Sequence, residues 1–260
     1  MKNTLDNPTH QQEIWFKTWF DSAHYHKLYQ NRDDREASAF IDALLRHLQP
    51  LPGSHMLDLA CGNGRHSKYL TQKGFNVTGL DLALSSISEA KIFETPALAF
   101  RQHDMRHPFG SNQYHYIFNF FTSFGYFKDE SENYTVVQNI GRALKPNGFV
   151  LFDYLNVGYA EENSVPVEEK EIDGTVYHIN RWSTDSFLYK RISIHEEGKS
   201  RPLEYIEKVA RFTAADFERF FKFQGLQTVQ LFGDYALNPY QPLRSKRLII
   251  LAQKHKNGTI

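Results

Sequence analysis

A glycine-rich turn between an apolar strand and a helix is the feature that most constrains the fold of this chain. The apolar stretch Met56–Leu59 runs into the turn Ala60–Gly64, and a helical pattern begins at Arg65. A second apolar stretch, Phe75–Asp81, ends in an acid roughly twenty residues after the first glycine of the turn. This spacing matches one helix crossover of a nucleotide-binding βαβ unit and predicts a parallel α/β sheet.

The residue types around this turn indicate the ligand. Glycine lets the backbone approach a ligand closely, and the next helix offers unpaired N–H groups to an anionic group. Asp81 can accept hydrogen bonds from both hydroxyls of a ribose. We therefore expect an adenosine-like molecule that carries a carboxylate or phosphate. The series Gly62, Gly64, Ser67 matches the dinucleotide fingerprint only in part, which makes a nicotinamide-dependent dehydrogenase the weakest alternative.

The segment Asp58–Arg65 reads DLACGNGR and places an acid inside the strand before the loop. In this form it resembles motif I of the class I S-adenosylmethionine-dependent methyltransferases. The resemblance implies that Asp58 holds the methionine end of the cofactor, often through water, and that Asp81 binds its ribose. The further cofactor contacts that it implies around this motif are Ala60, Gly62, Gly64 and Leu82.

Two further segments carry the same resemblance. Leu98–Met105 predicts a third strand that ends at the family's adenine-binding position, where Asp104 would accept from the exocyclic amine and Met105 would cover the ring. Tyr114–Asn119 predicts the fourth strand, and the following Phe120–Phe127, FFTSFGYF, resembles a segment of a small-molecule-type subgroup. The cofactor contacts implied in this segment are Phe120 and Phe121.

The first part of the chain is expected to form a helical lid over residues 1–50. Glu36–Leu45 has a clear 3.6-residue apolar period, and aromatic residues are frequent before it. The segment Tyr25–Asp33 resembles the lid of the same methyltransferase subgroup. This resemblance makes Tyr29 and Arg32 candidates for closing over the methionine moiety, with a surface position for Arg32 as an equal alternative.

A change of pattern marks an inserted subdomain at residues 157–212. Four stretches rich in β-forming residues are separated by turn sequences such as Asp173-Gly174, and they predict an antiparallel meander. We expect this sheet beside the carboxyl edge of the main sheet, as a cover for the substrate. Residues 51–156 and 213–260 then form a Rossmann-like domain, with a mostly parallel seven-stranded sheet whose last strand is reversed.

Composition narrows the classes of partner. Lys+Arg and Asp+Glu both number 30, so the formal net charge is zero, and the basic excess typical of nucleic-acid-binding proteins is missing. No run approaches eighteen apolar residues and the N-terminus has no signal-type apolar core, which predicts a cytoplasmic protein without a membrane span. Histidines are scattered and Cys61 is the single cysteine, so we expect neither an internal disulfide nor a metal site.

These expectations combine into an enzyme that transfers the methyl group of S-adenosylmethionine to a small-molecule acceptor and releases S-adenosylhomocysteine. Two alternatives stay open: an RNA or protein methyltransferase, which the neutral charge argues against, and a non-catalytic regulator that binds S-adenosylmethionine. A general base is needed only if the nucleophile starts protonated. No residue is assigned as catalytic, and the acceptor atom and the oligomeric state are left open. Side chains considered as the base are Ser123, Tyr126, Asp153, Tyr154, Asn156, Tyr177 and His178.

Overall fold

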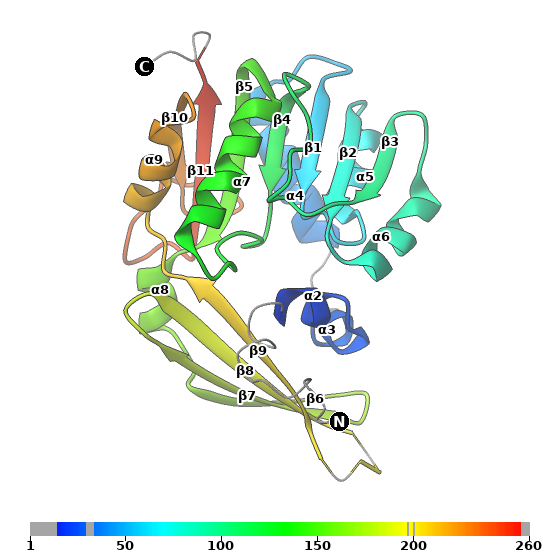
Figure 1. Ribbon diagram of the computed structural model, residues 1–260, viewed down its shortest axis with the longest axis vertical. Coiled ribbons are helices and arrows are strands. Elements are labelled where there is room, and N and C mark those ends of the chain that lie inside the picture. Colours follow the sequence, from blue (N-terminus) through cyan, green and yellow to red (C-terminus); the bar gives the residue numbers. More distant parts are fainter. Residues whose placement is uncertain (1–14, 30–33, 197, 200, 256–260) are drawn as a thin grey trace, which may run out of the picture.

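A seven-stranded sheet forms the core of the computed structural model, which describes residues 15–29, 34–196, 198–199 and 201–255. Its strands are β1 (His55–Leu59), β2 (Asn76–Asp81), β3 (Leu98–Gln102), β4 (Tyr114–Asn119), β5 (Leu144–Leu155), β10 (Leu226–Phe232) and β11 (Arg247–Lys254). They lie side by side in the order β10-β11-β5-β4-β1-β2-β3 (Figure 1). The third strand is shorter than predicted and ends at Gln102, which leaves Asp104 and Met105 in the following loop.

All strands of this sheet except the last are parallel. β1 pairs in parallel with β2 and β4, β2 with β3, and β4 with β5, whereas β11 is antiparallel to both β5 and β10. The chain passes from β1 to β2 and β3 on one side, then returns to β4 on the other side of β1. The carboxyl ends of β1 and β4 therefore border a topological switch point, where open α/β sheets bind ligands. The predicted sheet with a reversed last strand is confirmed.

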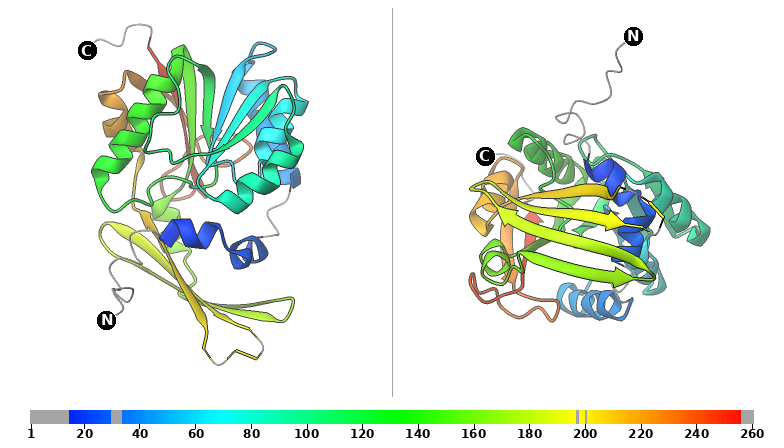
Figure 2. Two further views of the ribbon diagram at one scale, coloured as in Figure 1. Left: turned by 45° about the vertical axis from the view of Figure 1, so that its right-hand side comes forward. Right: turned by 90° about the horizontal axis from the view of Figure 1, so that it is seen from below.

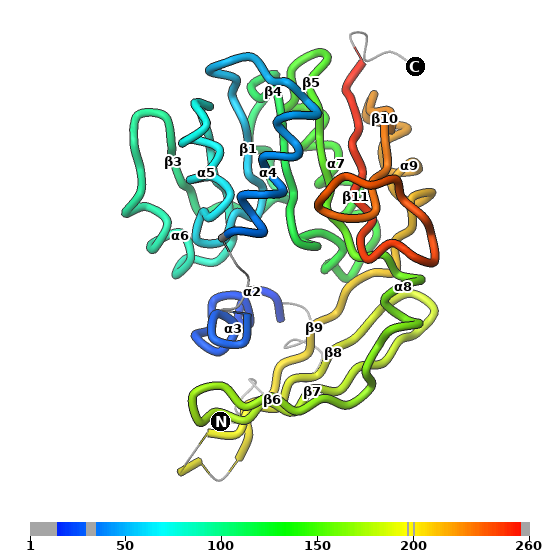
Figure 3. Tube along the Cα trace, turned by 180° about the vertical axis from the view of Figure 1, so that it is seen from behind, coloured from blue at the N-terminus to red at the C-terminus, as the bar shows by residue number. Residues whose placement is uncertain are grey.

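Helices cover both faces of the sheet. Their bounds are Asp34–Leu48 (α4), Arg65–Gln72 (α5), Leu84–Ala90 (α6), Glu130–Ala143 (α7) and Ala214–Lys222 (α9), and a 3₁₀ turn follows α6 at Lys91–Phe93. α4, α5 and α6 lie on one face, and α7 and α9 on the other (Figures 1 and 3). Capping boxes fix the start of α7, through Asp129 and Glu132, and of α9, through Thr213 and Asp216. Of the helices that the structure describes, none is long and apolar enough to cross a membrane.

The fifth strand begins earlier than the sequence suggests. The sequence predicts a turn at Lys145–Gly148, but β5 already starts at Leu144 and continues through this segment. Asn147 adopts a left-handed conformation with φ 63°, and the register with β4 shifts between Tyr114 and Tyr116. An irregularity of this kind absorbs the extra residues without ending the strand.

The inserted segment folds into α8 (Val157–Glu162) and a second sheet. Its strands are β6 (Val167–Ile172), β7 (Thr175–Ser183), β8 (Phe187–His195) and β9 (Leu203–Ala210). They pair in antiparallel order β6-β7-β8-β9, as the meander prediction requires. Alternate side chains are buried, Tyr177 and Ile179 on β7 and Ile192 and Ile194 on β8, so one face of the sheet packs inward. The β-rich pattern gave no indication of α8.

Two short helices of the N-terminal region lie between the two sheets. α2 (Trp15–Phe20) and α3 (Ala23–Leu28) face the carboxyl edge of the main sheet on one side and the inserted sheet on the other (Figures 1 and 2). Trp15 packs against Tyr126 of the main domain, with ring centroids 5.2 Å apart. Trp19 packs against Tyr205 of β9, at 4.6 Å. We call α2 and α3 the lid helices.

Candidate functional site

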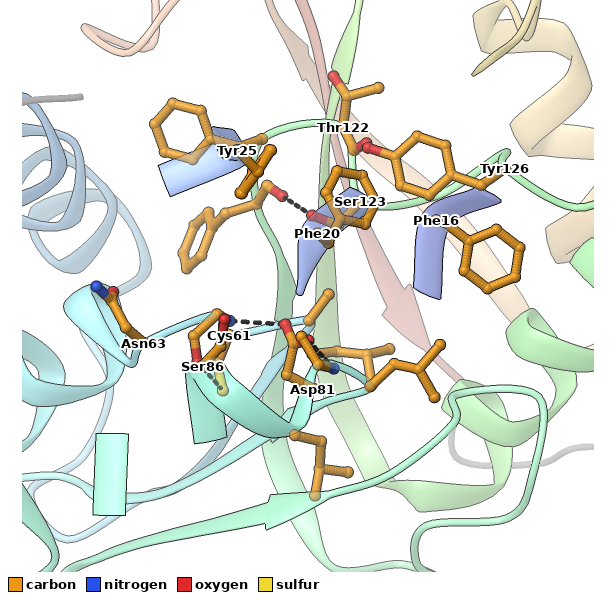
Figure 4. A pocket seen from close by; sticks show the side chains of 18 of the residues that line it. Phe16, Phe20, Tyr25, Cys61, Asn63, Asp81, Ser86, Thr122, Ser123 and Tyr126 are labelled. Atoms are coloured by element: carbon orange, nitrogen blue, oxygen red, sulfur yellow. Dashed lines mark hydrogen bonds between the residues drawn. The ribbon is translucent and has the colours of Figure 1, made fainter. Parts of the chain in front are cut away.

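A pocket of about 930 Å³ lies at the carboxyl ends of β1, β2 and β4, beneath the lid helices. In Figure 4, Phe16 and Phe20 of α2 lie across the pocket from Cys61 and Asp81 of the main domain. The pocket thus occupies the switch point of the sheet, the usual ligand position in this architecture. The predicted cofactor contacts that line it are Tyr29, Ala60, Gly62, Asp81, Leu82, Asp104, Met105, Phe120 and Phe121.

The carboxylate of Asp81 is held at the end of β2 by backbone amides. The Gly62 N–H donates to Oδ2 at 2.7 Å, and the Ala83 N–H donates to Oδ1 at 2.8 Å. Burial raises the pKa of this carboxyl above its ordinary value, although the hydrogen bonds from these amides offset part of the rise. A carboxylate has about four lone-pair positions, so acceptor capacity remains for ligand hydroxyls. The fixed orientation suits a bidentate contact with a ribose.

The glycine-rich turn combines open backbone with close packing. Ala60, Gly62 and Gly64 all have positive φ, at 65°, 55° and 78°. Gly62 lines the pocket, and no atom lies within 4 Å of the place where its Cβ would be. A Cβ on Gly64 would instead meet Cζ of Phe100 at 2.4 Å. Gly64 therefore does not line the pocket, and its role in the structure is the packing of the turn on the sheet.

Gly64→Ala is expected to destabilise the protein by about 2–4 kcal/mol, because the new methyl group is both overpacked and at positive φ. The matched control is Gly174→Ala in the hairpin between β6 and β7, where φ is 72° but no atom lies within 4 Å. That change should cost only about 1 kcal/mol. Urea unfolding of both variants measures the difference, and equal losses would contradict the packing explanation.

Asp58 lies behind the turn rather than on the pocket wall. Its side chain is buried, and Ser67 Oγ donates to Oδ2 at 2.6 Å. The second oxygen, Oδ1, is buried without a hydrogen-bond partner among the described residues. Burial raises the pKa of this carboxyl to about 7, against a smaller lowering by the Ser67 hydrogen bond. An unsatisfied oxygen of this kind can accept from an ammonium group or a water in the adjoining pocket.

The raised pKa of Asp58 predicts how stability depends on pH. The folded protein binds a proton at Asp58 more tightly than the unfolded chain, whose carboxyl has its ordinary pKa of 3.8. The resulting stabilisation is fully present below about pH 4 and is lost as the pH rises to about 7. The free energy of unfolding of the wild type, relative to Asp58→Asn, should fall across this window in urea unfolding experiments. A difference that stays constant from pH 4 to pH 8 would contradict the raised pKa.

Asp104 lines the pocket in the loop after β3 and is paired with Arg106. The guanidinium donates through Nη2 to Oδ2 at 2.6 Å and also contacts Glu132 at 2.6 Å. Burial alone raises the pKa of the Asp104 carboxyl, but the hydrogen bonds from Arg106 outweigh it and the pKa is lowered. Met105 is held beside it because Asn139 Nδ2 donates to its carbonyl oxygen at 3.1 Å. The two residues that were predicted to contact adenine are thus adjacent on one wall.

The segment after β4 has a strained backbone at the pocket. Phe121 and Thr122 both have φ 56°, a conformation that non-glycine residues adopt only when their surroundings enforce it. Asp153 provides the constraint, since its Oδ2 accepts from the Phe121 N–H at 2.9 Å and its carbonyl accepts from the Thr122 N–H at 2.8 Å. Phe120 stacks on His66, with ring centroids 4.4 Å apart.

Asp153 is a structural residue rather than an accessible base. It lies inside β5, two residues before the strand ends, and its side chain is fully buried. Arg247 Nε donates to Oδ1 at 2.7 Å, and the hydroxyl of Tyr235 donates to Oδ2 at 3.1 Å. Together with Phe121, these groups occupy both carboxylate oxygens. Asp153 thereby ties β5, β11 and the segment after β4 together.

All but one of the other side chains considered as a base also have structural partners. The hydroxyl of Tyr154 donates to the Ala210 carbonyl, and Asn156 Nδ2 donates to the carbonyls of Pro242 and Ser245. Ser123 Oγ donates to the Phe120 carbonyl. The Tyr126 hydroxyl donates to the Thr122 carbonyl. Of these, Ser123 and Tyr126 line the pocket. His178 pairs with Glu169 at 3.1 Å, away from the pocket. Tyr177 is buried, and its hydroxyl has no hydrogen-bond partner among the described residues.

Tyr29 lines the pocket and also makes a contact that was not predicted. The Tyr29 hydroxyl donates to Oε1 of Glu207 on β9 at 2.8 Å, so this side chain joins the lid helices to the inserted sheet. Arg32 lies outside the described residues. Glu207 and Arg247 line the pocket but were not predicted, and neither lies in a motif that could have revealed it. Among the described residues, no cluster of three or more His, Cys, Asp or Glu could hold a metal ion.

Comparisons with known proteins agree with the cofactor-binding character of the site. A family model described as a methyltransferase domain matches residues 56–148, from β1 into β5. The chain is also 26% identical over 220 residues to YqeM of Bacillus subtilis, a putative methyltransferase; the match covers 77% of this chain and 84% of that protein. The chain belongs to the class I S-adenosylmethionine-dependent methyltransferases.

Two further relatives of this methyltransferase have named acceptors. One is the dTDP-3-amino-3,4,6-trideoxy-α-D-glucopyranose N,N-dimethyltransferase of Streptomyces venezuelae, 25% identical over 76% of this chain and 85% of that protein. The other is the ubiquinone biosynthesis O-methyltransferase of Paracidovorax citrulli, 30% identical over 42% of this chain and 47% of that protein. The first match therefore spans most of both proteins, and the second spans less than half of each.

Solved structures confirm the fold of the methyltransferase. An S-adenosylmethionine-dependent methyltransferase from Clostridium acetobutylicum aligns with a TM-score of 0.74 at 19% identity, and covers 90% of this chain and 97% of that one. CalS10 from Micromonospora echinaspora, an amino pentose methyltransferase with bound S-adenosylmethionine, aligns with a TM-score of 0.66 at 16% identity, over 90% and 97%. At these identities the likeness concerns the fold alone.

Proposed function

We propose that this methyltransferase transfers the methyl group of S-adenosylmethionine to an amino nitrogen of a small molecule held between the lid helices and the inserted sheet. The observation that carries the proposal is the extent of the 930 Å³ pocket. It runs from Asp81 at the end of β2 to Glu207 on β9, with α2 and α3 as its roof. A roofed pocket of this kind suits a small acceptor better than a nucleic acid or a protein surface.

For the cofactor, the proposed contacts are on the core side of the pocket. Asp81 would bind the ribose hydroxyls with its remaining lone pairs, and Asp104 and Met105 would flank the adenine. Ala60 and Gly62 present backbone to the methionine end, and Asp58 would act on its ammonium group from behind the turn. The remaining proposed contacts are Leu82, Phe120, Phe121 and Tyr29, with Gly64 as packing support.

The relatives favour an amine as the acceptor group. The match to the amino-sugar N,N-dimethyltransferase covers 85% of that protein, whereas the match to the ubiquinone O-methyltransferase covers 47%. At 76% of this chain, the longer match must include residues outside the methyltransferase-domain match at 56–148, and such residues carry the information about the acceptor. That similarity supports nitrogen over oxygen.

The chemistry asks little of the protein beyond alignment. S-adenosylmethionine supplies a methyl group that its sulfonium already activates. The protein has to hold a nucleophile in line with the S–CH₃ bond and exclude water, and alignment can lower a barrier by up to about 7–11 kcal/mol. The aromatic side chains of the lid, with Trp19 fully buried and Trp15 nearly so, provide that exclusion.

Two measurements on the wild type test the proposal. Calorimetric titration with S-adenosylmethionine and S-adenosylhomocysteine measures the cofactor affinity. Formation of S-adenosylhomocysteine is then followed with dTDP-3-amino-3,4,6-trideoxy-α-D-glucopyranose, the acceptor in the name of the Streptomyces relative. Micromolar cofactor binding with acceptor-dependent turnover is expected. Cofactor binding without turnover of this amine would reject the proposed acceptor, and the absence of binding would reject the cofactor site.

A further inference from the structure

One acidic side chain stands apart from the others in the pocket. Asp81, Asp104 and the exposed Glu89 lie on the core side, and the first two are engaged by backbone amides and by Arg106, as described above. Glu207 is the one acid that the described part of the inserted sheet contributes to the pocket, and its side chain is 16% exposed. It lines the pocket on the side of the inserted sheet, as does Val209 two residues later on the same strand.

The two oxygens of Glu207 have different surroundings. Oε1 accepts from Trp19 Nε1 at 2.7 Å and from the Tyr29 hydroxyl at 2.8 Å, both from the N-terminal lid region. Oε2 has the ammonium of Lys190 at 3.7 Å, beyond hydrogen-bond distance. Each carboxylate oxygen has two lone pairs. Oε1 is therefore saturated, while Oε2 keeps acceptor capacity.

A role in holding the lid does not explain why this residue is charged. A neutral glutamine has one amide oxygen, which could accept from Trp19 and Tyr29 equally well. Burying a carboxylate costs free energy unless a partner compensates it. Lys190 donates a hydrogen bond to the Tyr29 hydroxyl and lies 3.7 Å from Oε2, so it compensates the carboxylate only partly. A charged acceptor that faces a ligand pocket gains from a ligand that donates to it.

Building on the proposed function, we infer that Glu207 determines acceptor specificity. Its Oε2 accepts a hydrogen bond from an amino or hydroxyl group of the acceptor, next to the atom that is methylated. The acceptor class is thus a small polar molecule with a donor group at this position, of which an amino sugar is an example. The Trp19 and Tyr29 hydrogen bonds to Oε1 hold the carboxylate in place and make acceptor binding sensitive to the position of the lid.

The test compares Glu207→Gln with Glu204→Gln. Glu204 lies on the same strand, is exposed and accepts from Ser193 Oγ at 3.1 Å, so it serves as the matched control. Initial rates are measured over a range of dTDP-3-amino-3,4,6-trideoxy-α-D-glucopyranose concentrations, and S-adenosylhomocysteine affinity is measured by calorimetry. For Glu207→Gln we expect KM for the amino sugar to rise about tenfold or more, since a hydrogen bond to a charged group is lost. Its affinity for S-adenosylhomocysteine should change less than about threefold, and Glu204→Gln should match the wild type.

Two results would overturn the inference while leaving the proposed function intact. The first is a Glu207→Gln variant whose KM for the amino sugar equals that of the wild type. The second is a loss of S-adenosylhomocysteine affinity as large as the rise in KM, because Glu207 would then act through the lid alone. A wild type that binds S-adenosylhomocysteine but does not methylate the amino sugar would reject both the inference and the proposed acceptor.

Discussion

Asp81→Ala is expected to weaken the binding of S-adenosylmethionine more than a hundredfold. The variant loses two hydrogen bonds from ribose hydroxyls to a carboxylate, each of about 1.5–3 kcal/mol. It also releases the Gly62 and Ala83 amides, which donate to Asp81 at 2.7 and 2.8 Å and hold the turn in its binding conformation. Calorimetric titration with S-adenosylmethionine and S-adenosylhomocysteine measures the loss.

The control for this prediction is Asp81→Asn. Its side-chain oxygen can still accept from one of the two amides, so the turn is better preserved and the affinity should be intermediate. Thermal unfolding of both variants establishes that they remain folded. A dissociation constant for Asp81→Ala within about threefold of the wild-type value would remove Asp81 from the cofactor site.

Asp153→Ala is expected to lower the free energy of unfolding by about 3–5 kcal/mol, because it leaves Arg247 with an uncompensated charge. The ion pair between them is 2.7 Å long, with the carboxylate fully buried and the guanidinium side chain 20% exposed. The substitution also removes the acceptor for the Phe121 N–H, which sustains the positive φ of that residue. Urea unfolding monitored by circular dichroism measures the loss.

A double variant separates the charge from the packing. Asp153→Leu combined with Arg247→Met replaces the pair by apolar side chains of similar size, which is often neutral or stabilising for buried ion pairs. The double variant should therefore be more stable than Asp153→Ala. If it is as unstable as the single variant, the hydrogen bonds to Phe121 and Tyr235 carry the stability, rather than the ion pair.

The core of the site was predictable because its residues are close in sequence. Asp81, Gly62 and the strands that bear them belong to one strand–turn–helix–strand unit, and the spacing within such a unit fixes the geometry. The exception within this unit is Gly64. The spacing of the glycines predicts that the backbone of Gly64 lies near a ligand. Gly64 lies close to Phe100, which belongs to β3, and the spacing of glycines does not reveal a contact with another strand.

The outer half of the site could not be predicted in the same way. Tyr29 lines the pocket, but its segment gave no indication that its hydroxyl bonds to Glu207, 178 residues later in the chain. Asp153 was considered a base at a strand end, and only the fold shows that Arg247 reaches it from β11. Successive side chains of a strand point to opposite faces of the sheet, but the sequence does not indicate which face lines the pocket. Contacts between separate sheets depend on how those sheets are placed.

The distribution of tryptophan gives this protein an optical reporter. Its three tryptophans are Trp15 and Trp19 of α2 and Trp182 of the inserted sheet, so none belongs to the nucleotide-binding core. Trp15 and Trp19 are 7% and 0% exposed, whereas Trp182 is 39% exposed. Withdrawal of α2 from the pocket would transfer two indoles from an apolar environment to water and shift the emission maximum to longer wavelength. Intrinsic fluorescence can therefore follow the entry and release of ligands in real time, without any label.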